Sequence, residues 1–150
     1  EIDKSTLFRV YQSISAGLVP DEESEHLRNR PVCVSGIEYT PTKELHKISE
    51  KLDEILHQQE QYTNPLERAV YLHCNIAQLQ PFANKNKHAS RMIESIVLMN
   101  ADIIPVYSLR ETDILNYKKG VLFFCETGEY SLYADYFLNR QIERIKEIEE

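Results

Sequence analysis

The sequence predicts a single all-α domain, residues 1–150, that carries one small β-hairpin. Apolar residues recur at helical spacing in about six segments, and one short segment alternates apolar and polar residues as a strand does. The chain has only four glycines and six prolines, which disfavours a loop-rich β-sandwich. With 150 residues, of which 42% are apolar and 27% charged, the chain can bury one ordinary core without disulfide or metal staples.

Six segments carry the helical pattern. In each of them apolar residues recur every three or four positions, so that one face of the helix can pack against a core. The expected helices are residues 5–16, 45–56, 65–79, 86–100, 109–125 and 132–148. The third has the clearest start, because Asn64 is a good N-cap and Pro65 suits the first helical position. Gly17 is expected to end the first helix, and Pro81 the third.

The one expected β-hairpin spans residues 32–39. Apolar residues alternate on both sides of a turn at Ser35 and Gly36. Because an isolated hairpin is only marginally stable in water, this one must pack on helices or on a partner. Its surface is expected to consist of Val34, Ser35, Gly36, Ile37 and Tyr39.

Charge and cysteine content narrow the function. The chain has 17 basic and 24 acidic residues, and its net charge of −7 repels phosphate backbones, which disfavours a sequence-reading nucleic-acid binder. The cysteines are odd in number and widely spaced, at Cys33, Cys74 and Cys125, so we expect buried free thiols in a reducing compartment. No apolar run is long enough to span a bilayer and no signal-peptide pattern is present, so we expect a cytoplasmic protein that does not bind membranes.

Most of the candidate functional residues of the sequence lie in the loop of residues 80–91. One helix ends at Pro81 and the next begins near Asn86, so the first free N–H groups of the new helix face the loop and favour an anion there. Cationic or potentially cationic side chains accompany them at Lys85, Lys87, His88 and Arg91. Phe82 is expected to turn inward and anchor the loop. The alternative is a solvated helix start that carries ordinary surface lysines.

This loop resembles the motif of the Fic family (filamentation induced by cAMP), which is commonly written HPFx(D/E)GNGRxxR. Pro81 and Phe82 match its Pro-Phe, Asn86 its Asn, and Arg91 its final Arg. The segment from Asn64 to His73 resembles the helix that precedes the motif. Residues 27–41 resemble the segment that leads into the family's flap hairpin. The similarity runs in order from Leu27 to Asn100.

The resemblance implies a Fic fold, about six helices with a β-hairpin flap. Family members mostly transfer AMP from ATP to a hydroxyl of a target protein, which makes them protein adenylyltransferases, and ATP and Mg²⁺ are the implied cofactors. The flap holds a segment of the target protein by strand addition, which needs only exposed backbone groups. By this resemblance the nucleotide-binding residues are Asn84, Lys85, Asn86, Lys87, His88 and Arg91.

The departures from the motif are as informative as the matches. Gln80 stands where the family has its His, and a Gln amide cannot act as a base near neutral pH. Asn84 replaces the carboxylate that helps to hold Mg²⁺, so it offers the metal an oxygen without negative charge. Lys85 and Lys87 replace glycines whose bare backbones let phosphates come close. His88 replaces the first Arg and its permanent charge.

Two classes of function remain open. The first is an enzyme, either an adenylyltransferase or a phosphotransferase of the Doc branch, which shares the pair Asn86-Lys87. The second is a pseudo-enzyme that binds a nucleotide or a protein without transferring anything. Losing a positioned general base typically removes about 10²–10⁴ of rate, so Gln80 favours impaired or absent transfer. His73 is a substitute base or, more simply, a core residue, and His88 is a second candidate for acid–base work.

Overall fold

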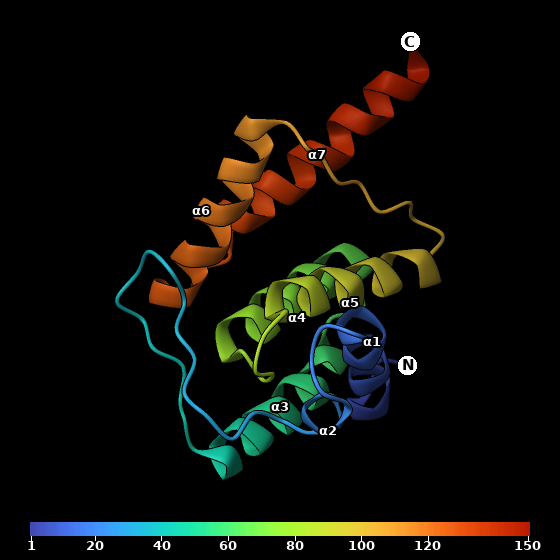
Figure 1. The fold of residues 1–150 in the computed structure, drawn as a ribbon. Coiled ribbons are helices and arrows are strands. Elements are labelled where there is room, and N and C mark those ends of the chain that lie inside the picture. Colours follow the sequence, from blue (N-terminus) through green and yellow to red (C-terminus); the bar gives the residue numbers. More distant parts are fainter.

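The computed structural model describes all residues from 1 to 150, which form seven α-helices and one short 3₁₀ turn (Figure 1). The helices are α1 (Lys4–Ser15), α2 (Asp21–Ser24), α3 (Leu45–Gln58), α4 (Pro65–Leu79), α5 (Asn86–Asn100), α6 (Glu111–Thr127) and α7 (Ser131–Glu149), and the 3₁₀ turn is η1 (Gln59–Gln61). The six predicted helices are confirmed to within two residues at every end. The single turn α2 is the one additional helix.

Helices α4 and α5 form the centre of the molecule (Figure 1). In this view α1, α2 and α3 lie on one side of them, and α6 and α7 lie on the other. Helix α4 is apolar on nearly every face and is buried along most of its length, as expected of a helix with neighbours all around. Because α4 and α5 are joined by the short loop of residues 80–85, that loop is fixed at both ends by the core.

The start of α4 forms as its sequence predicts. The side chain of Asn64 accepts hydrogen bonds from the backbone N–H groups of Leu66 at 2.8 Å and Glu67 at 3.4 Å, and Pro65 occupies the first helical position. These contacts satisfy two of the N–H groups that have no partner inside the helix.

The prediction of a β-hairpin at residues 32–39 is wrong. The chain does turn at Ser35 and Gly36, where Gly36 has a φ of 91°, but no backbone hydrogen bond joins the two arms and no strand forms. Instead the arms are held to the helices by side chains: Val34 is buried, and the Tyr39 hydroxyl donates to the carbonyl of Gln78 in α4 at 3.0 Å. The apolar alternation therefore reflects contacts with helices rather than strand pairing.

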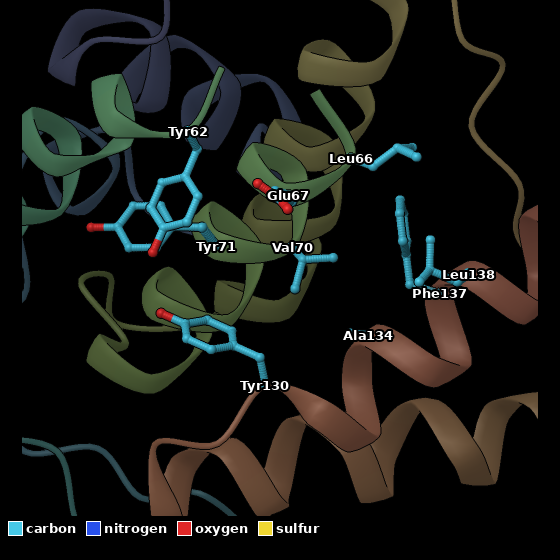
Figure 2. Close-up of a pocket in the computed structure, with 9 residues that line it drawn as sticks. All are labelled: Tyr62, Leu66, Glu67, Val70, Tyr71, Tyr130, Ala134, Phe137 and Leu138. Carbon is cyan, nitrogen blue, oxygen red and sulfur yellow. The ribbon is translucent and has the colours of Figure 1, made fainter. Parts of the chain in front are cut away.

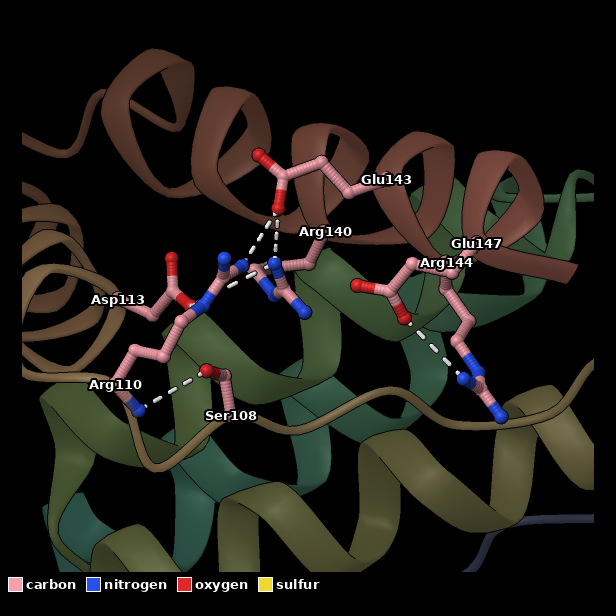
Figure 3. Close-up of polar contacts among 7 residues, drawn as sticks. All are labelled: Ser108, Arg110, Asp113, Arg140, Glu143, Arg144 and Glu147. Atoms are coloured by element: carbon pink, nitrogen blue, oxygen red, sulfur yellow. Dashed lines mark hydrogen bonds and ion pairs between the residues drawn. The ribbon is translucent and has the colours of Figure 1, made fainter. Parts of the chain in front are cut away.

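A cluster of ion pairs fixes the end of the long connector between α5 and α6 (Figure 3). Arg110 donates to Asp113 in α6 at 2.8 Å and to Glu143 in α7 at 2.7 Å. The buried Arg140 of α7 contacts Glu143 and lies 3.6 Å from Asp113. Ser108 accepts from the backbone N–H of Arg110 at 3.1 Å, so the connector enters α6 in a defined conformation.

The cysteines form no disulfide, but the prediction that all of them are buried is wrong for Cys33. Cys74 and Cys125 are buried in the core, and Cys33 is exposed in the segment before α3. None of the helices has the length and apolarity that a membrane span requires.

Candidate functional site

Helix α1 forms the floor beneath the loop that joins α4 to α5. Phe82 is fully buried, and its ring stacks on Tyr11 of α1 with centroids 3.8 Å apart and an interplanar angle of 7°. The ring of Phe8 meets Phe82 edge-on at 5.7 Å. Phe82 is therefore buried beneath the loop, in contact with Tyr11 and Phe8 of α1.

Asn86 closes the loop on itself. Its side-chain oxygen accepts from the backbone N–H of Phe82, and its side-chain nitrogen donates to the carbonyl of Phe82, both at 2.9 Å. Only 4% of Asn86 is exposed. Both polar atoms of the amide thus make hydrogen bonds inside the loop, so Asn86 shapes the site.

Two residues of the loop adopt the left-handed conformation that usually favours glycine. Lys85, directly before α5, has φ 57° and ψ 23°, at a position where the family motif has Gly. Gln80, directly after α4, has φ 51° and ψ 60°. Its side-chain nitrogen donates to the carbonyl of Ala77 at 2.6 Å, so the amide folds back onto the last turn of α4.

Arg28 is a residue of the site that the sequence did not single out. It is 3% exposed and donates to the carbonyl of Gln80, to Leu79 at 3.2 Å and to Thr42 at 2.6 Å. Its positive charge lies at the C-terminal end of α4, where the helix dipole favours a cation. No local pattern marks Arg28, because two of its partners lie 51 and 52 residues further along the chain.

A cavity of about 280 Å³ opens beside the first turns of α5. It is lined by Lys87, His88, Arg91, Tyr107, Ser108, Leu109, Ile114, Tyr117, Lys118 and Tyr136. We call it the cationic pocket. Its four basic side chains come from α5 and α6, and no carboxylate lies within 4.0 Å of any of them, although the chain as a whole has a net charge of −7.

Arg91 lies between two aromatic rings in this pocket. The central carbon of its guanidinium is 4.8 Å from the ring centroid of Tyr117 and 5.6 Å from that of Tyr107, which are cation–π distances. An aromatic face attracts the charge without consuming the N–H donors in hydrogen bonds. Arg91 is therefore oriented while its donors remain free to meet an anion.

His88 is exposed at the mouth of the cationic pocket. Partial burial lowers the pKa of its imidazole, and the positive charges of Lys85, Arg91 and Lys87 lower it further. A bound anion would offset those charges and raise the pKa of His88 again. The residue can thus gain a proton when an anion arrives.

The loop does not provide a protein-held magnesium site. Asn84, the position that the family resemblance assigns to the metal, is exposed, and its side-chain oxygen accepts from the Tyr11 hydroxyl at 3.0 Å. No group of three or more His, Cys, Asp or Glu side chains in the chain is arranged to hold a metal ion. Because Mg²⁺ prefers several oxygen ligands with negative charge among them, the residues present do not fit it.

The segment that was expected to form the flap lies next to the loop. Arg28 joins the two directly through its bonds to Thr42 and Gln80. Residues 29–43 make no backbone–backbone hydrogen bonds. The carbonyls of Arg30, Glu38 and Thr42 accept from side chains, and the other backbone groups of the segment have no partner within the chain. Ser35 and Gly36 at the tip are exposed, and Ile37 is half-buried.

A second cavity, of about 240 Å³, lies along the first half of α4, away from the loop of residues 80–85 (Figure 2). It is lined by Tyr62, Leu66, Glu67, Val70, Tyr71, Tyr130, Ala134, Phe137 and Leu138. Figure 2 shows that these side chains come from α4, from α7 and from the residues just before each of the two helices. Its one charged group, Glu67, is an acid. This cavity therefore has none of the anion-binding character of the cationic pocket.

His73, considered above as a substitute base, is fully buried in α4. Its Nε2 atom is 3.0 Å from the hydroxyl of Tyr117, behind the wall of the cationic pocket. It has no solvent-exposed face from which to receive a proton directly.

Comparisons with known proteins agree with this architecture. The model of the Fic/DOC family matches residues 1–98. A solved structure of a Fic-1 fragment from C. elegans is similar over 98% of this chain and 43% of its own, with a TM-score of 0.81 and 18% sequence identity. A variant of the same fragment has the same coverage and identity, with a TM-score of 0.72. No curated protein matches the sequence.

The structural matches and the family match support different conclusions. At 18% identity the structural likeness shows the fold alone, and the chain spans less than half the length of those solved structures. The family model covers about two thirds of the chain, from α1 through the loop to nearly the end of α5. On that evidence the chain belongs to the Fic/DOC family.

Proposed function

We propose that this Fic domain binds the phosphates of a nucleotide such as ATP in the cationic pocket and transfers AMP slowly or not at all. The observation that carries the proposal is the set of four unpaired basic side chains that face one cavity of an acidic chain. Arg91 lies over Tyr107 and Tyr117, and the third tyrosine of the cavity, Tyr136, offers a ring on which a base can stack. Helix α5 adds free N–H groups at its first turn, beside Lys87 and His88.

The expected affinity is modest. Lys85 and Lys87 occupy space that glycines leave open in the family motif, and no protein carboxylate assists a metal ion on the phosphates. We therefore expect ATP to bind with a Kd weaker than about 1 μM, which corresponds to about −8 kcal/mol. Added Mg²⁺ should change this affinity little.

Impaired transfer follows from Gln80. In the family the His at this position takes the proton of the attacking hydroxyl, whereas the amide of Gln80 has no basic atom and donates to the carbonyl of Ala77. The loss of a general base costs about 10²–10⁴ in rate. A target protein would still find unpaired backbone groups in residues 29–43, where strand addition is feasible.

The phosphotransferase chemistry of the Doc branch is a second candidate, since Asn86-Lys87 resembles that branch. The same absence of a base at Gln80 argues against it. A domain that binds nucleotide or protein without transfer agrees with all of these residues.

Binding is tested by calorimetric titration with ATP, with and without Mg²⁺. Lys118→Ala removes one cation of the pocket, and Lys119→Ala is a matched control on the same helix that does not line it. We expect about a fivefold loss of affinity for the first variant, from about 1 kcal/mol of charge interaction, and no change for the second. Equal effects of the two substitutions, or no binding by the unmodified chain, would refute the proposal.

Transfer is tested by incubation with labelled ATP and cell lysate. We expect little or no label on any protein from the unmodified chain or from Gln80→His alone, because a base cannot act on a misaligned nucleotide. Rescue should require Gln80→His together with four further changes that restore the motif: Asn84→Asp, Lys85→Gly, Lys87→Gly and His88→Arg. Label transfer by Gln80→His alone would show that only the base is missing.

A further inference from the structure

A buried carboxylate lies one helical turn after Arg91. Glu94 is on α5, only 2% exposed, on the face that packs into the core. The Tyr133 hydroxyl donates to its Oε1 atom at 2.5 Å, and the Tyr107 hydroxyl approaches Oε2 at 3.5 Å. Burying a carboxylate costs free energy unless hydrogen bonds replace those to water, so we expect the groups that contact Glu94 to be specifically placed.

His73 connects the carboxylate of Glu94 to a third tyrosine, Tyr117. The Nδ1 atom of His73 has no hydrogen-bond partner and lies 3.5 Å from Oε1 of Glu94, while Nε2 contacts the hydroxyl of Tyr117 at 3.0 Å. A proton on Nδ1 faces the negative carboxylate and leaves Nε2 to accept from Tyr117. The opposite tautomer would place a lone pair against the carboxylate. A charged Glu94 would therefore favour the Nδ1–H tautomer of His73 and, through it, one orientation of the Tyr117 hydroxyl.

The two tyrosines reached in this way are the two walls around Arg91. Tyr117 and Tyr107 are the rings on which its guanidinium lies. The Tyr107 hydroxyl has one proton and lies 3.1 Å from the backbone carbonyl of Arg91 and 3.5 Å from Oε2 of Glu94, so it donates to one of these acceptors at a time. It also contacts the hydroxyl of Ser95. One buried carboxylate is thus connected to both walls, to one directly and to the other through His73.

We propose that Glu94 is a positioning residue that holds Arg91 in the orientation needed to meet a phosphate. It acts through Tyr107 on one side and through His73 and Tyr117 on the other. For the identity of the ligand, the phosphates of a nucleotide, this inference rests on the proposed function. The placement of Arg91 itself is a property of the free protein.

Simple electrostatics predicts the opposite effect on binding. The negative charge of Glu94, one turn from Arg91, opposes an anion in the pocket, so Glu94→Gln should tighten anion binding if charge alone matters. If Glu94 positions Arg91, the same substitution should weaken binding, because the amide no longer selects one tautomer of His73. The sign of the change separates the two explanations.

The experiment compares the unmodified chain, Glu94→Gln and Glu126→Gln. Glu126 is exposed on α6 and makes no ion pair, so its substitution makes the same charge change without contacts. We expect Glu94→Gln to weaken binding of sulfate and of ATP about five- to tenfold in calorimetry, and Glu126→Gln to leave it unchanged. Tighter or equal binding by Glu94→Gln would overturn the proposal.

A second measurement needs no ligand. Side-chain ¹⁵N relaxation of Arg91 Nε should show an ordered guanidinium in the unmodified chain and a mobile one in Glu94→Gln. The imidazole ¹⁵N shifts of His73 should show the Nδ1–H tautomer only while Glu94 is present. If the unmodified chain binds neither sulfate nor ATP, the proposed function fails while these spectra still test the positioning. Unchanged Arg91 order would overturn it whatever the affinity.

Loss of folding in Glu94→Gln would not end the test. Tyr117→Phe keeps the ring under Arg91 and removes only the hydroxyl that His73 holds. We expect it to increase the mobility of Arg91 and to weaken sulfate binding two- to threefold. An ordered Arg91 with full affinity in a folded Tyr117→Phe variant would contradict the proposal.

Discussion

Replacing Phe82 by Ala is the most direct test of how the loop is anchored. Phe82 is fully buried although it belongs to a loop, and it stacks on Tyr11 at 3.8 Å and meets Phe8 at 5.7 Å. The substitution removes both ring contacts and leaves a hole between α1 and the start of α5. It should therefore affect stability and the site together.

The expected size follows from these contacts. Truncation of a buried Phe to Ala costs about 3–5 kcal/mol, including the cavity that remains. About 0.5–1.5 kcal/mol of this reflects the aromatic pairs, beyond the area that they bury. The loop cannot easily collapse into the hole, because Asn86 binds the backbone of Phe82 on both sides and Arg28 holds the preceding carbonyls. We therefore expect a loss of about 3–5 kcal/mol.

Urea denaturation followed by circular dichroism measures this loss as a fall in the midpoint at constant slope. Phe123→Ala, at a half-buried position on α6, is the control and should cost about 1 kcal/mol. A loss below about 1 kcal/mol for Phe82→Ala would refute the anchoring role, since a ring that is buried as described cannot be removed so cheaply.

Three further predictions concern single residues. Lys85→Gly should raise the free energy of unfolding by up to about 1 kcal/mol in urea denaturation, because glycine accepts the left-handed conformation without strain; a loss of stability would show that the Lys side chain supports the fold. Sulfate, which stays doubly charged, should bind more tightly as the pH falls below about 6.5, because the anion raises the lowered pKa of His88 and the complex takes up a proton; His88→Gln should abolish this pH dependence, and its persistence would point to another group. Asp113→Asn should cost about 1–3 kcal/mol in thermal or urea denaturation, because it weakens the contact with the buried Arg140; Glu147→Gln, which breaks only an exposed pair, should cost less than about 0.5 kcal/mol, and equal effects would contradict the argument.

The helices could be predicted because their signals are local. Asn64 and Pro65 mark the start of α4, and the period of the apolar residues marks the faces that pack. The position of the loop followed from Pro81 and from the polar residues before α5. The inward turn expected for Phe82 needed only that it be the apolar residue among polar ones.

The remaining features depend on contacts between distant residues. The alternation in residues 32–39 looks like that of a strand, but side chains such as Tyr39 bind α4 instead of a second strand. Arg28 supports the loop through partners about 50 residues away, which no spacing rule reveals. The cationic pocket combines α5 with α6 and the connector, so Tyr107 and Lys118 could not be assigned to it from the sequence.

The matches to the Fic motif and the departures from it fall on different sides of the loop. Pro81 and Phe82 are fully buried, and Asn86 is nearly so. The departing positions, Gln80, Asn84, Lys85, Lys87 and His88, are all half-buried or exposed. What resembles the motif therefore builds the loop, and what differs from it faces solvent and any ligand.

Arg91 is the one residue that matches the motif without being buried. It matches the motif, is half-buried rather than buried, and lines the cationic pocket. Fold stability alone does not require a guanidinium held between two tyrosines with its donors unpaired. A site that has Gln80 and Asn84 where the motif has its His and its carboxylate, but that keeps the arginine, is better suited to holding an anion than to transferring a group, in agreement with the proposed function.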